Sequence, residues 1–102
     1  MTRFAQLQSW YASHCNGEWE HAHGVKIDSL DNPGWWVRID LTGTKLEDAS
    51  FGPRLERQSE VDWLDCKVKD KIFDGAGDPS KLEMILAVFL DWARQHEGVT
   101  PA

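Results

Sequence analysis

The densest cluster of chemically active side chains lies between residues 14 and 23. It holds three imidazoles, one thiol and two carboxylates, in the order His14, Cys15, Glu18, Glu20, His21 and His23. On a strand, His21 and His23 would point to one face two residues apart, which provides half of a zinc site. Cys15 or His14 would complete that site. Structural zinc sites usually show a second closely spaced pair, which this sequence lacks, so ordinary hydrogen-bonded or surface histidines are the favoured interpretation.

The two cysteines do not occupy positions that favour a nucleophile. Cys66 falls on the strand face that we expect to point inward, and buried cysteine behaves as a small apolar side chain. Cys15 follows a helix, at the negative end of the helix dipole, where a thiolate is disfavoured. The sequence contains no phosphate loop, nucleophile elbow, zinc-protease motif or dinucleotide fingerprint. We therefore expect no enzyme and no cofactor. The alternative is a small metal- or ligand-binding protein, or a minor enzyme, built on Cys15, His21 and His23.

Six tryptophans are a large number for a chain of 102 residues. Trp36 and Trp63 alternate out of phase with the apolar residues of two predicted strands, so they point away from the expected core. Asp40 and Asp65 share their phase. Aromatic side chains exposed among charges are typical of interface hot spots. An equally weighted alternative is that a loop, or the segment 42–53, covers these tryptophans.

Two helices are predicted from the spacing of apolar residues. Residues 3–14 form the first, and its apolar stripe, with Trp10 beside it, is Phe4, Leu7, Tyr11 and His14. The second has a broader stripe, which consists of Leu82, Ile85, Leu86, Phe89, Trp92 and Ala93. We expect this helix to begin at Asp78-Pro79 or at the capping box that starts at Ser80, and to end at Gly98.

Between the helices, alternating apolar and polar residues predict an antiparallel sheet of about four to five strands. The expected strands cover residues 21–28, 35–41, 54–59, 61–69 and, after a tight turn at Asp70-Lys71, a short stretch from 72. The side chains expected to face the core are Trp35, Val37, Ile39, Leu41, Leu64, Cys66 and Val68. The order helix, strands, helix predicts one α+β domain over residues 1–102, with the C-terminal helix packed on one sheet face.

The charge balance narrows the choice of partners. With 17 acidic and 11 basic residues, the chain carries a formal charge of −6. Nucleic acid and anionic membranes are poor partners for such a protein, because both require a basic footprint. The longest apolar run, Met84 to Leu90, is far shorter than the roughly 20 residues of a membrane span. The start of the chain shows no secretory signal, which predicts a cytoplasmic protein with reduced thiols. The acid excess favours a basic protein partner. The alternative is that the negative charge only keeps the protein soluble.

Short segments along almost the whole chain form a recognisable pattern. They are Trp10-Tyr11, Cys15 to His21, Gly24 to Ile27, Leu30 to Trp35, Val37 to Leu41, Gly43-Thr44, Ser59 to Trp63, Cys66 to Val68 and the helix around Trp92. The most specific part is the string Leu-Asp-Asn-Pro-Gly-Trp with Trp-Glu-His upstream. Together these segments resemble the immunity protein 53 family, from which Trp36 and His23 depart locally.

The resemblance implies a cytoplasmic antidote of a bacterial polymorphic toxin system, which binds its cognate toxin domain and blocks it. It implies no catalytic residues. Combined with the acid excess, it predicts an immunity protein whose toxin partner is basic. The residues expected at the contact form two patches: Trp36, Trp63, Asp40 and Asp65 on the sheet, and Glu18, Glu20, His21 and His23 near the first helix.

Overall fold

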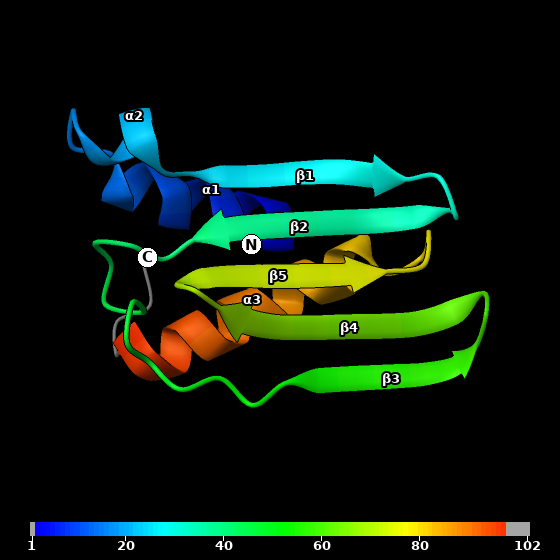
Figure 1. Ribbon diagram of the computed structural model, residues 1–102. Coiled ribbons are helices and arrows are strands. Elements are labelled where there is room, and N and C mark those ends of the chain that lie inside the picture. Colours follow the sequence, from blue (N-terminus) through cyan, green and yellow to red (C-terminus); the bar gives the residue numbers. More distant parts are fainter. Residues whose placement is uncertain (1, 98–102) are drawn as a thin grey trace.

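The computed structural model describes residues 2–97, which form three helices and one five-stranded sheet. In chain order the elements are α1 (Arg3–His14), α2 (Trp19–Ala22), β1 (Val25–Leu30), β2 (Gly34–Asp40), β3 (Arg54–Ser59), β4 (Asp62–Lys69), β5 (Ile72–Gly77) and α3 (Leu82–Glu97). The strands lie in the order β1-β2-β5-β4-β3, and every neighbouring pair is antiparallel (Figure 1). The predicted α+β class, with a helix at each end of the sheet in sequence, is confirmed.

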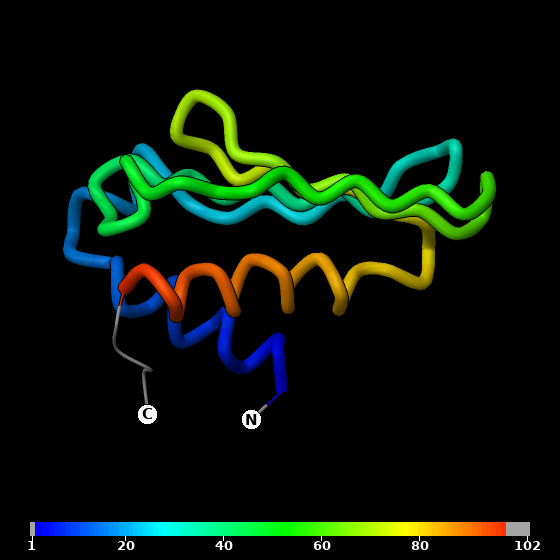
Figure 2. The backbone as a smooth tube through the Cα atoms, turned by 90° about the horizontal axis from the view of Figure 1, so that it is seen from below, coloured from blue at the N-terminus to red at the C-terminus, as the bar shows by residue number. Residues whose placement is uncertain are grey.

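The two long helices lie on the same side of the sheet, as Figure 2 shows. α3 packs on the three central strands and on α1. Its buried residues are those of the predicted stripe with Leu90 added, while Leu82 is only partly buried. Burying each large apolar side chain stabilises the fold by about 1.5–3 kcal/mol. α3 is therefore the helix that contributes most to the packing on this face of the sheet. No helix within the described residues is long and apolar enough to cross a membrane.

The central strands follow the predicted alternation. Val37 and Ile39 of β2, and Leu41 just after it, have no exposed surface. Leu64 and Cys66 of β4 join them in the same core cluster beneath the helices. Because side chains alternate between the two faces of a strand, their neighbours in sequence point to the opposite side of the sheet.

The predicted hairpin turn between β4 and β5 is confirmed. Asp70 and Lys71 form it alone, and both have positive φ, 54° and 63°. A two-residue turn with this backbone conformation matches the right-handed twist of the flanking strands. It brings β5 back beside β4, in the middle of the sheet.

The segment between β2 and β3 packs into the core between the sheet and the helices. Leu46 is fully buried there. Phe51 meets Trp92 of α3 edge to face, with 5.2 Å between the ring centres, and the indole N–H of Trp92 donates to the Ser50 carbonyl at 2.8 Å. This segment therefore does not cover the other sheet face, so the alternative in which residues 42–53 bury the outward tryptophans is wrong.

The buried side of α1 differs from the prediction. Leu7 faces the core as expected, but Trp10 is 3% exposed, whereas Phe4 and Tyr11 are 45% and 37% exposed. The ring of Trp10 packs edge to face on Phe89 of α3, with 5.0 Å between centres. The contact with α3, which the helix's own periodicity does not reveal, selects the side that carries Trp10.

The first strand begins later than predicted. The residues around His21 form the single helical turn α2, and His23 follows that turn before β1 begins. Trp19 anchors α2, because its ring is buried and its indole N–H donates to the Thr42 carbonyl at 2.8 Å. His21 and His23 therefore do not share the face of a strand, and this expectation is wrong.

The start of α3 also differs from both predicted positions. The helix begins at Leu82, because Asp78 and Ser80 form a separate turn before it. The structure describes the helix as far as Glu97. The predicted end at Gly98 lies outside the described residues.

Candidate interaction surface

The sheet face opposite the helices carries the four residues of the predicted sheet patch, Trp36, Trp63, Asp40 and Asp65. We call it the open face, because neither long helix lies over it (Figures 1 and 2). The registers arrange its side chains in two rows across the strands: Asp28, Trp36, Ala76 and Asp65 in one, and Lys26, Arg38, Asp74 and Lys67 in the next. Asp40 lies at the end of the same face of β2. The predicted sheet patch is therefore on one surface.

Trp36 is held near the middle of the open face by two neighbours. Its indole N–H donates to Oδ1 of Asp74 at 2.8 Å. The guanidinium of Arg38 lies over the indole, 5.2 Å from the ring centre. A ring fixed in this way has little rotamer freedom left to lose when a partner covers it. Its side chain is only partly buried, so it keeps surface that a partner can reach.

His23 and Asp40 are paired at the edge of the open face. Nδ1 of His23 lies 2.7 Å from Oδ2 of Asp40, and the Thr42 N–H donates to the other carboxylate oxygen at 2.9 Å. Burial by itself raises the pKa of Asp40, but the hydrogen bonds from Thr42 and His23 outweigh it and hold that pKa below its ordinary value. The Asp40 carboxylate thus joins the end of α2 to the end of β2.

Trp63 points to the open face but is not exposed there. Only 9% of the residue is accessible to solvent, and the guanidinium of Arg57 lies over its ring. The ring reaches Gly34 of β2, where an added Cβ would lie 3.5 Å from its Cζ2. The expectation of a second exposed tryptophan is wrong, because the ring lies against Gly34 and beneath the guanidinium of Arg57.

Asp78 is a buried carboxylate, 1% exposed, that contacts the backbone of Trp63. It accepts hydrogen bonds from Nζ of Lys81 at 2.7 Å, from the hydroxyl and N–H of Ser80 at 2.6 and 2.8 Å, and from the Trp63 N–H at 2.8 Å. The bonds from Lys81 and Ser80 hold the pKa of Asp78 well below its usual range. These contacts tie β4 to the turn that leads into α3, so they serve the fold.

The open face has mixed charge although the chain is acidic. Its basic and acidic side chains nearly balance: Lys26, Arg38, Arg57, Lys67 and Lys69 against Asp28, Asp40, Asp65 and Asp74. The whole chain carries a formal charge of −6, so the acid excess lies on other surfaces. A protein that docks on this face must present both signs of charge to it.

The second predicted patch, around α2, is divided by the structure. The carboxylate of Glu20 accepts the backbone N–H groups of Asn16 and Gly17 at 2.8 and 2.7 Å. Backbone hydrogen bonds, from its own N–H and from those two residues, hold the pKa of Glu20 below its ordinary value. Glu20 therefore closes the turn between α1 and α2, whereas Glu18 and His21 are exposed.

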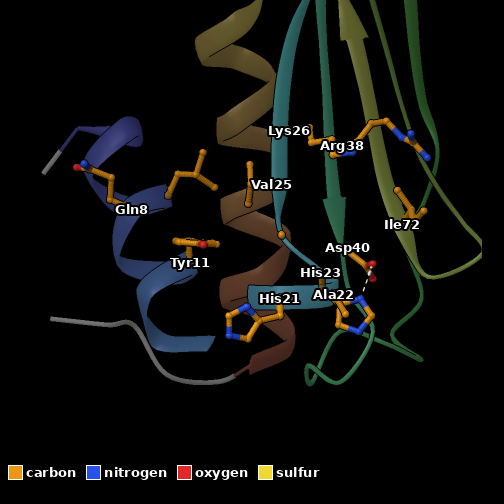
Figure 3. Close-up of a pocket in the computed structure, with 12 residues that line it drawn as sticks. Gln8, Tyr11, His21, Ala22, His23, Val25, Lys26, Arg38, Asp40 and Ile72 are labelled. Carbon is orange, nitrogen blue, oxygen red and sulfur yellow. Dashed lines mark hydrogen bonds and ion pairs between the residues drawn. The ribbon is translucent and has the colours of Figure 1, made fainter. Parts of the chain in front are cut away.

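The side chains of the metal-site alternative do not converge. Cys15 and His14 hydrogen-bond to backbone carbonyls of their own helix, α1. Figure 3 shows the rings of His21 and His23 well apart, with His23 turned toward Asp40. Within residues 2–97, no three His, Cys, Asp or Glu side chains are placed to hold a metal ion. The geometry gives this alternative no support.

Comparison with protein families matches residues 4–94 to the family described as immunity protein 53. The chain belongs to the immunity protein 53 family. The match runs from α1 into α3, so it covers both the helix layer and the sheet. No curated protein and no solved structure matches the chain.

Membership in the immunity protein 53 family confirms the resemblance seen in the sequence. It implies that the protein neutralises a toxin, and therefore that a cognate toxin is its partner. Immunity proteins are typically not enzymes.

One residue that shapes the open face of this immunity protein was missed from the sequence. Asp74 follows the buried Phe73 in β5. Alternation alone places Asp74 on the open face, provided that the strand extends beyond Phe73. From the sequence alone, Gly75-Ala-Gly77 is expected to end the sheet, because glycines in a strand pattern usually mark a break. The structure includes both glycines in β5. Asp74 then pairs with Arg38 of β2 on one side and with Lys67 of β4 on the other.

Proposed function

We propose that this protein neutralises its cognate toxin by direct protein–protein contact, with Trp36 at the centre of the contact on the open face. The observation that carries the proposal is the immobilised ring of Trp36 on a face that no described helix covers. Tryptophan and arginine are enriched among residues that dominate binding energy, and such residues cluster near the centre of an interface. Trp36 and Arg38 form such a pair.

The charges of the protein act at two ranges in this proposal. The net charge of −6 attracts a basic toxin over a distance and raises the association rate. The mixed charges of the open face act at contact, where they select the orientation of the toxin. We therefore expect the association rate to fall with added salt, because the Debye length is about 10 Å at 0.1 M. The dissociation rate depends instead on Trp36.

The test uses the cognate toxin domain. Trp36→Ala is compared with Trp35→Ala, which makes the same truncation at the preceding residue. The side chain of Trp35 points to the helix side, and its indole N–H donates to the Pro79 carbonyl. We expect Trp36→Ala to raise the Kd of the complex about 30-fold or more and to abolish growth rescue. Trp35→Ala should bind nearly as the wild type does. Thermal unfolding of both variants separates lost contact from lost fold.

Two results would count against the proposal in different ways. If Trp36→Ala binds the toxin as tightly as the wild type, the open face is not the contact, although direct binding stands. If the wild-type protein rescues growth without forming a complex on a sizing column or in calorimetry, direct contact is not the mechanism.

A further inference from the structure

The sheet has two edge strands, and they differ in how they are protected. β3 carries charged side chains at Arg54, Glu56 and Arg57, and its register with β4 shifts between Arg57 and Ser59. Charges and bulges are the usual devices that prevent an edge from pairing with another strand. β1, at the other edge, pairs with β2 over six consecutive residues without a shift. β1 is therefore the edge whose geometry suits an added strand.

The outward backbone groups of β1 follow from one hydrogen bond. The Asp40 N–H donates to the Gly24 carbonyl at 3.0 Å, directly before β1 begins. Residues of an antiparallel strand alternate between bonding to the neighbour and pointing away from it, so Val25, Ile27 and Ser29 direct their N–H and C=O groups away from β2. In the described sheet no strand lies beyond β1, which leaves these groups accessible to another main chain.

A cavity of about 630 Å³ lies at the beginning of the same edge, where α2 leads into β1 (Figure 3). On the helix side, Leu7 and Tyr11 of α1 and Val25 of β1 line it. Ile27 shares the face of Val25, and Tyr11 and Ile27 are 37% and 39% exposed. A strand added to β1 would place every second side chain over this apolar lining.

On the open-face side, Lys26 of this edge strand lies beside a second cation, Arg38 of β2. Lys26 pairs directly with Arg38, and like charges at such positions repel. Among the described residues neither of them forms an ion pair, and Nε of Arg38 is shielded from solvent without a hydrogen-bond partner. Asp74, on the other side of Arg38, already accepts the Trp36 N–H. A carboxylate on an added strand would complement this pair.

We propose that an extended segment of the toxin adds to β1 as a sixth strand. On the helix side of the sheet, apolar side chains of this toxin segment lie over Val25 and Tyr11. On the open-face side, an acidic side chain of the same segment lies beside Lys26. Main-chain hydrogen bonds supply affinity in this mode, and the alternating side chains supply specificity. The proposal rests on the proposed function, direct toxin binding, and defines the chemistry of the toxin segment that takes part.

Amide hydrogen exchange on the full chain, with and without the purified toxin domain, tests the added strand. In the protein alone, the outward amides of Val25, Ile27 and Ser29 have no strand partner and exchange rapidly. In the complex they are expected to slow by about tenfold or more. The amides of Lys26 and Asp28 point toward β2 and serve as internal references, with a much smaller change.

A pair of variants tests the same edge by affinity. Ser29→Pro removes one outward N–H and leaves the ladder to β2 intact, which an edge strand tolerates. Ser29→Ala loses the same hydroxyl but keeps the N–H. We expect Ser29→Pro to bind the toxin about tenfold more weakly than Ser29→Ala, with both variants folded by thermal unfolding. Lys26→Glu should also weaken binding, and more than Lys45→Glu, the same charge change in an exposed loop.

The outcomes separate this proposal from the function on which it rests. A complex in which the three outward amides exchange as fast as in the free protein would overturn strand addition and leave direct binding standing. Protection of those amides without toxin, together with a doubled mass on a sizing column, would assign β1 to a second copy of this chain and overturn the toxin segment. Failure of the wild-type protein to form any complex would overturn the proposed function itself.

Discussion

The indole N–H of Trp36 lies 2.8 Å from Oδ1 of Asp74, on the neighbouring strand. The two residues are not directly paired, because Trp36 stands opposite Ala76 and Asp74 stands opposite Arg38. The hydrogen bond therefore runs diagonally between the two strands on the open face. It fixes the orientation of Trp36 before a partner arrives.

Removing this bond should weaken toxin binding without unfolding the protein. We expect Asp74→Ala to raise the Kd of the toxin complex about 3- to 10-fold, because Trp36 would then lose rotamer freedom on binding. Asp74→Asn keeps an acceptor oxygen and should restore most of the affinity. Isothermal titration calorimetry measures both. Equal affinities for the alanine variant and the wild type would contradict the positioning role.

The buried carboxylate of Asp78 should make the protein sensitive to acid. Its pKa in the folded protein lies well below the ordinary value of 3.8, because Lys81 and Ser80 donate hydrogen bonds to it. A lowered folded pKa means that the stabilisation is complete above the ordinary pKa and is lost as the pH falls toward the folded value. We therefore expect the free energy of unfolding to decrease below about pH 4.

Asp78→Asn should flatten that decrease and lower the melting temperature at neutral pH. Asp62→Asn, which removes the more exposed carboxylate partner of Lys81, is the matched control and should retain the wild-type slope. Thermal unfolding followed from about pH 2 to pH 7 gives both slopes. Parallel curves for the wild type and Asp78→Asn would assign the acid sensitivity to other groups.

The two thiols should differ sharply in reactivity. Cys66 is fully buried, and burial raises its pKa to about 12. Cys15 is exposed at the end of α1. In a thiol-labelling assay near pH 8 we expect one fast thiol in the native protein and a second only after unfolding. Cys15→Ser should abolish the fast phase, whereas Cys66→Ser should retain it; two fast thiols in the wild type would contradict the buried position.

Gly34 should not tolerate a side chain. An added Cβ would overlap the backbone carbonyl of Gly77 on the neighbouring strand. We expect Gly34→Ala to lower the free energy of unfolding by about 1–3 kcal/mol, as overpacking does. Gly52→Ala is the control, because nothing lies within 4 Å of its added Cβ. Urea unfolding measures both, and equal stabilities would refute the close packing at Gly34.

Much of the fold was predictable because its determinants are local. Val37 and Ile39 alternate with polar residues, and a shift of one residue would move the whole apolar set to the solvent side. The stripe of α3 allows only one buried side. Asp70 and Lys71 interrupt two alternating runs at the spacing of a two-residue hairpin. The same alternation placed Trp36 on the open face before any tertiary contact was known.

Other features depended on partners that are distant in sequence. Trp10 is buried because α3 packs beside α1, and no periodicity within α1 records that contact. Trp19 holds the residues around His21 in a helical turn, because its ring packs edge to face on Trp10 of α1 and its indole N–H donates to the Thr42 carbonyl, just after β2. Trp63 is buried although it points to the open face, because its ring lies against Gly34 of β2, which is distant in sequence.

The candidate site shows the same division. Strand alternation has a period of two, so the sequence by itself determined that Trp36, Asp40 and Asp65 share one face of the sheet. The strand order was decided only by the tertiary structure. The pairing of β2 with β5 brings Trp36 to Asp74 across 38 positions of sequence, and it leaves β1 at an edge. Such pairing depends on how whole faces fit against α3, which no short stretch of sequence encodes.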